Sequence, residues 1–216
     1  SFNWQPTEVI KYQLVEGWHV FFASMAISLY TISTIFILGV FTNNIAVGYF
    51  AAADKLIQAA KGIYSPVSQA IYPLISKKMH EDQKQGMLFL EKTVLVVGGV
   101  MFLISLTMFF GAEVLVNLVL GDKYQESILL VQIMSFLPFV IGLSNMFGIQ
   151  GMLNAGLKKE FTAIVSFSAL LGVGMMCWFV PIYESIASSV IQVIVESFVM
   201  ILMFCVLFKK TAFLND

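Results

Sequence analysis

Long apolar stretches alternate with short polar connections along the whole chain. Six such stretches can be drawn, each long enough to cross about 30 Å of hydrocarbon at about 1.5 Å per helical residue. The pattern therefore predicts an all-α integral membrane protein, with residues 1–216 forming a single six-helix transmembrane lobe. The predicted spans are about 17–41, 45–76, 87–112, 125–153, 161–180 and 185–208.

Composition supports a membrane environment and excludes one class of partner. Hydrophobic residues make up 59% of the 216 residues and charged residues only 12%, against about a quarter in an ordinary soluble domain. All twelve basic residues are Lys, and the bidentate phosphate recognition that Arg provides is therefore absent from the sequence. We therefore expect no nucleic-acid partner.

The lysines crowd into alternate connections between the predicted spans. Only Lys123 falls in the opposite set of connections. Because Lys-rich connections stay in the cytoplasm, this asymmetry predicts cytoplasmic ends for the chain, and connections near Asn43, Gly121 and Tyr183 outside. The pattern therefore predicts a multi-pass membrane protein. The cytoplasmic set comprises Lys11, Lys77, Lys78, Lys84, Lys158, Lys159, Lys209 and Lys210.

The second predicted span carries a polar stripe. At 100° per residue, Asp54, Gln58, Lys61 and Tyr72 fall within about 40° of one line along the helix. Lys61 lies roughly 20 Å into the span at 1.5 Å per residue, too deep to extend easily to either surface. Polar side chains at membrane depth are costly and frequently functional, so we expect this stripe to face other helices or a cavity.

Proline positions predict irregularities in the same span. Pro66 has no N–H and clashes with the carbonyl of Gly62, which predicts a kink near residues 62–66. Pro73 predicts a second break closer to the cytoplasmic end.

Further deep polar residues lie in the fourth and sixth spans. Asn145 lies in the fourth, and Gln192 and Glu196 share a polar face of the sixth, where Glu196 lies about 18 Å from the outer boundary. Two hypotheses follow. In the first, a buried ion-pair network of Asp54, Lys61 and Glu196 fixes the register of the helices. In the second, Lys61 attracts an anionic head group, and the carboxylate of Glu196 or Asp54 binds a coupling proton or cation.

Enzyme signatures are missing from the sequence. It contains no G-x-S-x-G elbow, P-loop or H-E-x-x-H motif, and no clustered metal ligands. Cys177 and Cys205 lie inside hydrophobic runs and are interpreted as packing residues. We therefore predict a non-enzymatic protein without a cofactor or a metal site.

Residues 38–77 carry motifs that resemble a known family. An Asn-rich turn leads into VGYFAAADKL at 47–56, and the segment ends in YPLIS at 72–76. The VLGDKYQES stretch at 119–127 and LSNMFGIQGMLNAGLKKEF at 143–161 add to the likeness. Together these segments resemble the Wzx O-antigen flippases of the multidrug/oligosaccharidyl-lipid/polysaccharide exporter superfamily.

This resemblance implies a fold and a function. Full-length members have twelve helices in two lobes around a central cavity, of which this chain would supply the C-terminal six. The sequence opens with Ser1 and a polar stretch, and we expect it to continue a longer chain. The implied activity is transfer of undecaprenyl-pyrophosphate-linked oligosaccharide to the periplasmic leaflet of the bacterial inner membrane for lipopolysaccharide biosynthesis. The resemblance also implies a polysaccharide polymerase and chain-length proteins as further partners.

Other function classes remain open at this point. A cation-coupled multidrug or metabolite exporter of the same superfamily is the main alternative, although a cationic cavity favours a lipid-linked anion. A membrane enzyme of polysaccharide assembly would need catalytic residues and a substantial outer loop, which the sequence lacks. An assembly subunit without transport is favoured only if the 216 residues are the entire protein.

Overall fold

The computed structural model describes residues 7–212, and helices account for nearly all of them. The elements follow one another with short connections, and none of the described residues forms a strand. In chain order they are α1 Thr7–Phe41, α2 Asn44–Gly62, α3 Tyr64–Glu81, α4 Gln83–Phe110, α5 Ala112–Val119, the 3₁₀ turn η1 Asp122–Tyr124, α6 Ser127–Met134, α7 Leu137–Asn145, the π-helix η2 Met146–Met152 and α8 Lys158–Ala212.

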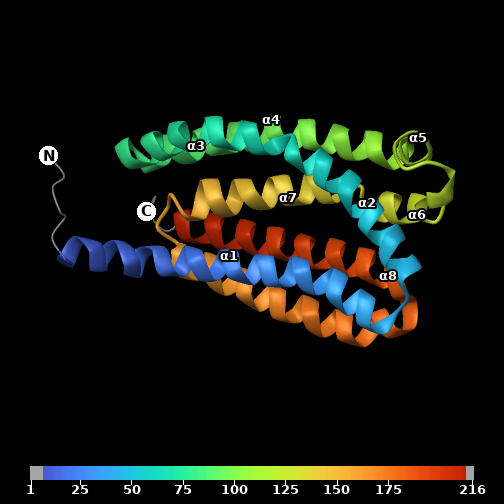
Figure 1. The fold of residues 1–216 in the computed structure, drawn as a ribbon. Coiled ribbons are helices and arrows are strands. Elements are labelled where there is room, and N and C mark those ends of the chain that lie inside the picture. Colours follow the sequence, from blue (N-terminus) through green and yellow to red (C-terminus); the bar gives the residue numbers. More distant parts are fainter. Residues whose placement is uncertain (1–6, 213–216) are drawn as a thin grey trace, which may run out of the picture.

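The helices run back and forth along one elongated bundle (Figure 1). Helix α1 runs the length of the bundle, and α2 and α3 together run back. Helix α4 then runs the length of the bundle again and leads to α5 and η1. The chain then returns through α6, α7 and η2 before α8 begins. The start of α1, the α3–α4 connection and the end of α8 therefore lie together at one end.

Lysines are concentrated at that same end of the bundle. The connections containing residues 77–84 and 158–159 lie there, and Lys210 near the end of α8 forms an ion pair with Glu160. Lys123 belongs to η1 at the opposite end. The fold thus brings together the lysine-rich connections that the sequence pattern assigned to one side.

Four helical stretches of the described chain are long and apolar enough to cross a membrane. The predicted all-helical, membrane-spanning fold is confirmed at this level. The stretch predicted at residues 45–76 is not among the four, because charged and polar residues interrupt it. The four are Ser24–Phe41, Gln83–Phe110, Ser127–Met152 and Lys158–Lys210.

The second predicted span consists of two helices. Helix α2 ends at Gly62 and α3 begins at Tyr64, so the predicted kink near 62–66 is confirmed. Pro66 lies in the first turn of α3, where a missing N–H costs little. The prediction of a second break at Pro73 was wrong, because α3 continues through this residue to Glu81.

The fourth predicted span, residues 125–153, is also divided. Helix α6 ends near Ser135, whose hydroxyl donates to the Gln132 carbonyl at 2.7 Å, and Pro138 lies in the first turn of α7. The π-helix η2 follows α7 without a gap. Inside it, a Cβ at Gly148 would lie 2.7 Å from Met203 Sδ, so the missing side chain lets η2 approach α8 closely.

The fifth and sixth predicted spans form the two arms of α8. The backbone reverses at Glu184, whose φ of 50° and ψ of −129° are non-helical. Figure 1 shows the two arms running in opposite directions side by side. Each arm is longer than the roughly 20 residues that a membrane crossing requires.

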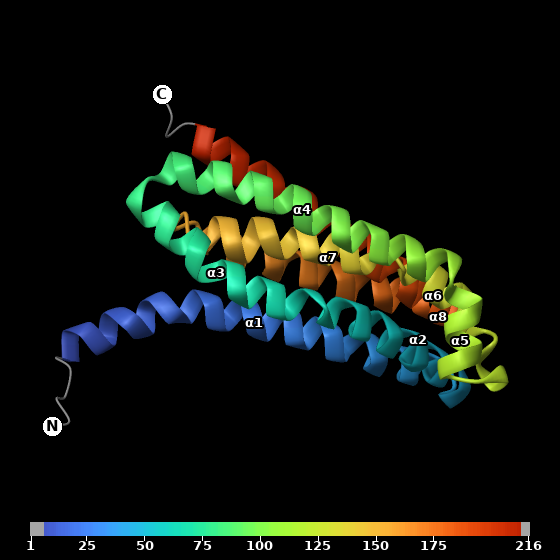
Figure 2. The same ribbon diagram turned by 90° about the horizontal axis from the view of Figure 1, so that it is seen from above.

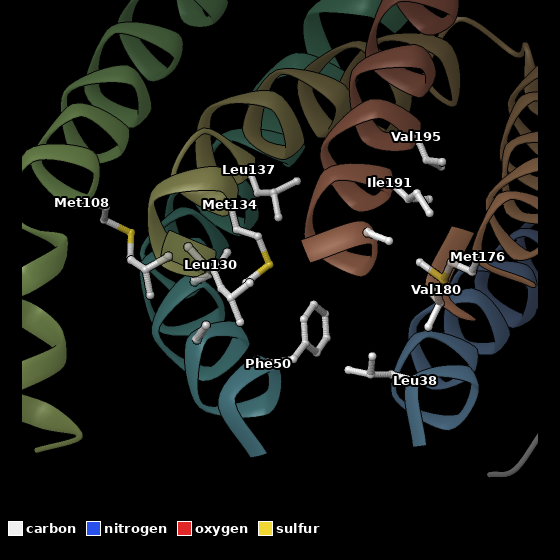
Figure 3. Close-up of a cluster of buried hydrophobic side chains, with 14 of the residues drawn as sticks. Leu38, Phe50, Met108, Leu130, Met134, Leu137, Met176, Val180, Ile191 and Val195 are labelled. Carbon is white, nitrogen blue, oxygen red and sulfur yellow. The ribbon is translucent and has the colours of Figure 1, made fainter. Parts of the chain in front are cut away.

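Two apolar clusters hold the bundle together. The first lies toward the Glu184 end, and Figure 3 shows its side chains meeting between α2, α6, α1 and α8. Its fully buried members include Leu38, Phe50, Met134 and Met176. The second joins α3, α4, η2 and the lysine-rich part of α8 through Ile75, Leu90, Met146, Met152 and Leu207.

Candidate functional site

Helix α2 positions its polar stripe beside a buried apolar face. Asn43 caps the helix by accepting hydrogen bonds from the Ile45 and Ala46 amides at 3.0 and 2.9 Å. Buried Phe50, Ala53, Ile57 and Ala60 then fix the rotation of α2 against the bundle. This rotation directs Gln58 and Lys61 toward the space bounded by α7 and α8.

A cavity of about 340 Å³ lies between α1, α2, α7 and α8. Its lining draws apolar side chains from both clusters, including Val195 of the first and Val199 of the second. The cavity therefore lies between the two apolar clusters. Five of the predicted site residues line it, namely Gln58, Lys61, Asn145, Gln192 and Glu196.

A second cavity of about 380 Å³ adjoins the first and is bounded by α2, α3, α4 and α7. Gln58, Lys61 and Asn145 line both cavities. Figure 2 shows α2 and α3 running between α1 on one side and α4 on the other. Lys61 lies in the last turn of α2, next to the start of α3 at Tyr64. Lys61 thus stands where the two cavities meet.

Lys61 is near carboxylates but is not paired with one. It interacts electrostatically with Asp54 and Glu196. Within the part of the chain that the structure describes, no carboxylate oxygen lies within 4.0 Å of its ammonium group. The closed ion-pair network considered from the sequence is therefore absent in this conformation, and the Lys61 charge faces the cavities.

The remaining predicted site residues lie outside the two cavity linings. Asp54 is half-buried on α2, and its two carboxylate oxygens accept long hydrogen bonds of 3.5 Å from Gln58 Nε2. Tyr72 lies on α3 with 40% of its surface exposed. The structure therefore brings together Gln58, Lys61, Asn145, Gln192 and Glu196, and leaves Asp54 and Tyr72 outside both cavity linings.

Sequence reasoning missed two hydroxyls of the first cavity. Tyr30 and Ser168 line it, and both are buried. Each lies in an apolar run without a charged neighbour, so hydrophobic patterning gave no signal for them. A weak signal was Gly172, one helical turn beyond Ser168, because a small residue in an apolar run favours close helix approach.

A buried amide joins the π-helix to α3. Gln150 is fully buried, and its Nε2 donates to the Ser68 hydroxyl at 2.9 Å and to the Ser68 carbonyl at 3.1 Å. Ser68 itself lines the second cavity. This contact fixes one wall of that cavity, and π-helical segments frequently occur at functional sites.

The site thus combines an ammonium group, a carboxylate, amides and hydroxyls inside a membrane-spanning bundle. Such a cavity can hold an anionic group near Lys61 and a cation near Glu196, because each ligand charge would meet the opposite charge. Fold and site together define an α-helical integral membrane protein with a charged central cavity.

Comparisons with known proteins give a consistent result. The family described as "Polysaccharide biosynthesis protein" matches residues 1–79. A "Putative O-antigen transporter" of Escherichia coli (strain K12) is 33% identical over 194 residues, which cover 90% of this chain and 47% of the relative. A "Putative O-antigen transporter" of Shigella dysenteriae is 28% identical over 158 residues, covering 73% and 39%. No solved structure gives a significant match.

The chain is thus similar to the polysaccharide biosynthesis family over residues 1–79 and to two putative O-antigen transporters over most of its own length, in agreement with the motif resemblance. It spans about half the length of the curated relatives that it matches.

Proposed function

We propose that this chain forms one lobe of a transporter that moves undecaprenyl-pyrophosphate-linked O-antigen units across the bacterial inner membrane. The observation that carries this proposal is Lys61, a cation halfway along the bundle that lines two adjoining cavities without a contact ion pair among the described residues. The names of both relatives support the same activity.

The two charges of the cavity have separate roles in this proposal. Lys61 attracts the pyrophosphate, which carries the negative charge of the lipid-linked substrate. Gln58 and Asn145, which line both cavities with Lys61, supply hydrogen bonds to the same head group. Glu196 binds the coupling proton or cation. The sugar units would then pass to a polysaccharide polymerase and chain-length proteins on the outer face.

The proposal is tested by deleting the gene in its own host. The deletion strain is expected to lose surface polysaccharide and to accumulate lipid-linked oligosaccharide in the inner membrane, and the full-length gene should reverse both effects. Gel analysis of lipopolysaccharide and extraction of lipid-linked sugars measure them. Unchanged surface polysaccharide in the deletion strain would argue against a transport role.

The proposed lobe crosses the membrane six times with both ends in the cytoplasm. Its helices would be the second half of a twelve-helix transporter. Four apolar stretches and the grouping of lysine-rich connections at one end of the bundle support this arrangement. The two arms of α8 count as separate crossings, and the α2–α3 pair, whose polar stripe faces cavities, is the sixth.

Cysteine labelling of intact cells tests the topology. Cys177 and Cys205 are exposed and must first be replaced. A cysteine introduced at Asn43 should then react with a membrane-impermeant reagent from outside. Cysteines introduced at Lys78 and Lys158 should react only after permeabilisation. Labelling at 78 in intact cells, with no labelling at 43, would reverse the proposed orientation.

A further inference from the structure

The start of α3 supplies a polar wall to the second cavity. Tyr64, Ser65, Ser68 and Gln69 all line this cavity of about 380 Å³. Tyr64 and Ser68 are four residues apart, as are Ser65 and Gln69, so the four side chains share one side of the helix. Among the described residues that line the cavity, Lys61 alone is charged. Beyond Lys61 the wall therefore offers hydroxyl and amide groups without charge.

One buried hydroxyl of this wall has no hydrogen-bond partner in the described part of the chain. It is Tyr64 Oη, and only 6% of the Tyr64 surface is exposed. This hydroxyl lies near the side chains of Ser68 and Gln150, and Gln150 Oε1 is a second buried oxygen without a partner. Buried polar groups nearly always form hydrogen bonds, so two such oxygens beside one cavity point to a ligand that supplies their partners.

Packing and hydrogen bonds fix the buried part of the wall. The Tyr64 ring belongs to the second apolar cluster, which joins α3 to α4, η2 and α8. Gln150 of η2 donates from Nε2 to the Ser68 hydroxyl at 2.9 Å. Because Ser68 accepts in this bond, its own proton remains available to a ligand. These groups are thus held in position before a ligand binds.

The remaining two side chains of the wall are more accessible. Ser65 and Gln69 are exposed, and Gln69 Nε2 donates to the Ser65 hydroxyl at 3.1 Å. Ser65 also accepts in its bond, so its proton is likewise available to a ligand. Ser65 follows Lys61 by four residues and lines the same cavity. The polar groups therefore extend from the ammonium group of Lys61 to the buried hydroxyl of Tyr64.

A sugar ring suits this combination of groups. Each sugar hydroxyl can donate and accept a hydrogen bond, and the wall offers hydroxyls and an amide that do the same. In the proposed substrate the first sugar is bonded directly to the pyrophosphate, so it must lie beside Lys61 when the pyrophosphate does. The lining of the first cavity contains the Glu196 carboxylate, whereas that of the second contains no acidic residue. The second cavity is therefore the better match for an uncharged sugar.

We propose that Tyr64, Ser65, Ser68 and Gln69 form a subsite that recognises the sugar attached directly to the pyrophosphate. This inference rests on the proposed function, because Lys61 would place the pyrophosphate at the edge of the same cavity. Tyr64 distinguishes the sugar-bearing lipid from the bare lipid carrier, since its buried hydroxyl gains a partner only when the sugar is present.

The experiment compares two lipids as ligands of the purified full-length protein. One is undecaprenyl pyrophosphate, and the other is the lipid-linked oligosaccharide extracted from membranes of the host. The wild-type protein should bind the oligosaccharide lipid at least about tenfold more tightly, because several hydrogen bonds are added. Tyr64→Phe removes only the hydroxyl and should reduce this preference about twofold to tenfold, with the affinity for undecaprenyl pyrophosphate unchanged.

Two further variants make the result specific to this wall. Tyr72→Phe is the matched control, because Tyr72 lies on the same helix, is 40% exposed and lies outside both cavity linings. It should bind both lipids as the wild-type protein does. Gln69→Ala changes an exposed residue and should also reduce the preference for the oligosaccharide lipid, which gives a second test that leaves the buried ring intact. Thermal unfolding of each variant verifies that it is folded.

The possible failures separate the subsite from the proposed function. Equal affinity of the wild-type protein for the two lipids would overturn the subsite and leave the role of Lys61 standing. The subsite would also be overturned if Tyr64→Phe and Gln69→Ala kept the full preference, or if they weakened binding of both lipids equally. Failure of the wild-type protein to bind either lipid would contradict the proposed function itself, and the subsite with it.

Discussion

Replacing Lys61 with alanine in the full-length protein is expected to abolish O-antigen display while membrane levels of the protein stay normal. The substitution removes the ammonium group that lines both cavities and would hold the pyrophosphate. A hydrogen bond to a charged group contributes about 1.5–3 kcal/mol, which corresponds to roughly 10- to 150-fold in substrate affinity. Lipopolysaccharide gels and quantitative blotting of the tagged protein measure the two quantities.

Two further variants make this result specific to the position of the charge. Lys55→Ala removes a neighbouring lysine of α2 that is exposed and outside both cavity linings, so it should leave display unchanged. Lys61→Arg keeps the charge and should retain partial display. Full display by Lys61→Ala at normal abundance would exclude Lys61 from the mechanism.

The second large effect is expected from Glu196→Gln. The side chain keeps its size and loses its charge, so cation coupling should fail and O-antigen display should be lost. Lys61 remains intact in this variant, and we expect substrate binding to persist. Surface polysaccharide and abundance of the tagged protein are measured as for Lys61. Wild-type display by Glu196→Gln would argue against any role for this carboxylate in the transport cycle.

The double variant Lys61→Ala/Glu196→Gln separates function from a structural ion pair. If the two charges only stabilise the fold, each single replacement leaves an uncompensated charge, and breaking such a pair costs about 3–5 kcal/mol. Abundance would then fall in both single variants and recover in the double variant. We expect the opposite, namely normal abundance in all three variants and no display from any of them.

Much of the helical architecture could be predicted because the membrane imposes a simple rule on length and hydrophobicity. The ends of α1 at Phe41 and of α4 at Phe110 lie within a few residues of the predicted boundaries. The break before Pro66 was equally accessible from sequence, since proline removes a specific hydrogen bond. The continuation of α3 through Pro73 could not be predicted from the sequence, because helix packing decides whether the loss of the backbone hydrogen bond is tolerated.

The divided fourth stretch and the hydroxyls of the cavity show where hydrophobic patterning stops being informative. Residues 125–153 are predominantly apolar, and their few polar residues give no period that distinguishes α7 from the π-helix η2. Charged and amide side chains such as Lys61 and Gln192 are costly to bury in a membrane and therefore rare in apolar runs. They can be recognised in the sequence for this reason. Tyr30 and Ser168 are common membrane-helix residues, and only the packing around Gly172 brings them into the site.

Binding of undecaprenyl pyrophosphate to the purified full-length protein tests the central claim most directly. The lipid carries the charged group without the sugar and therefore isolates the contribution of Lys61. The wild-type protein and Lys55→Ala should bind it with equal affinity, and higher salt should weaken both. Lys61→Ala should bind at least about tenfold more weakly. Equal affinity of the Lys61→Ala and wild-type proteins would contradict the assignment of this cavity to the anionic head group.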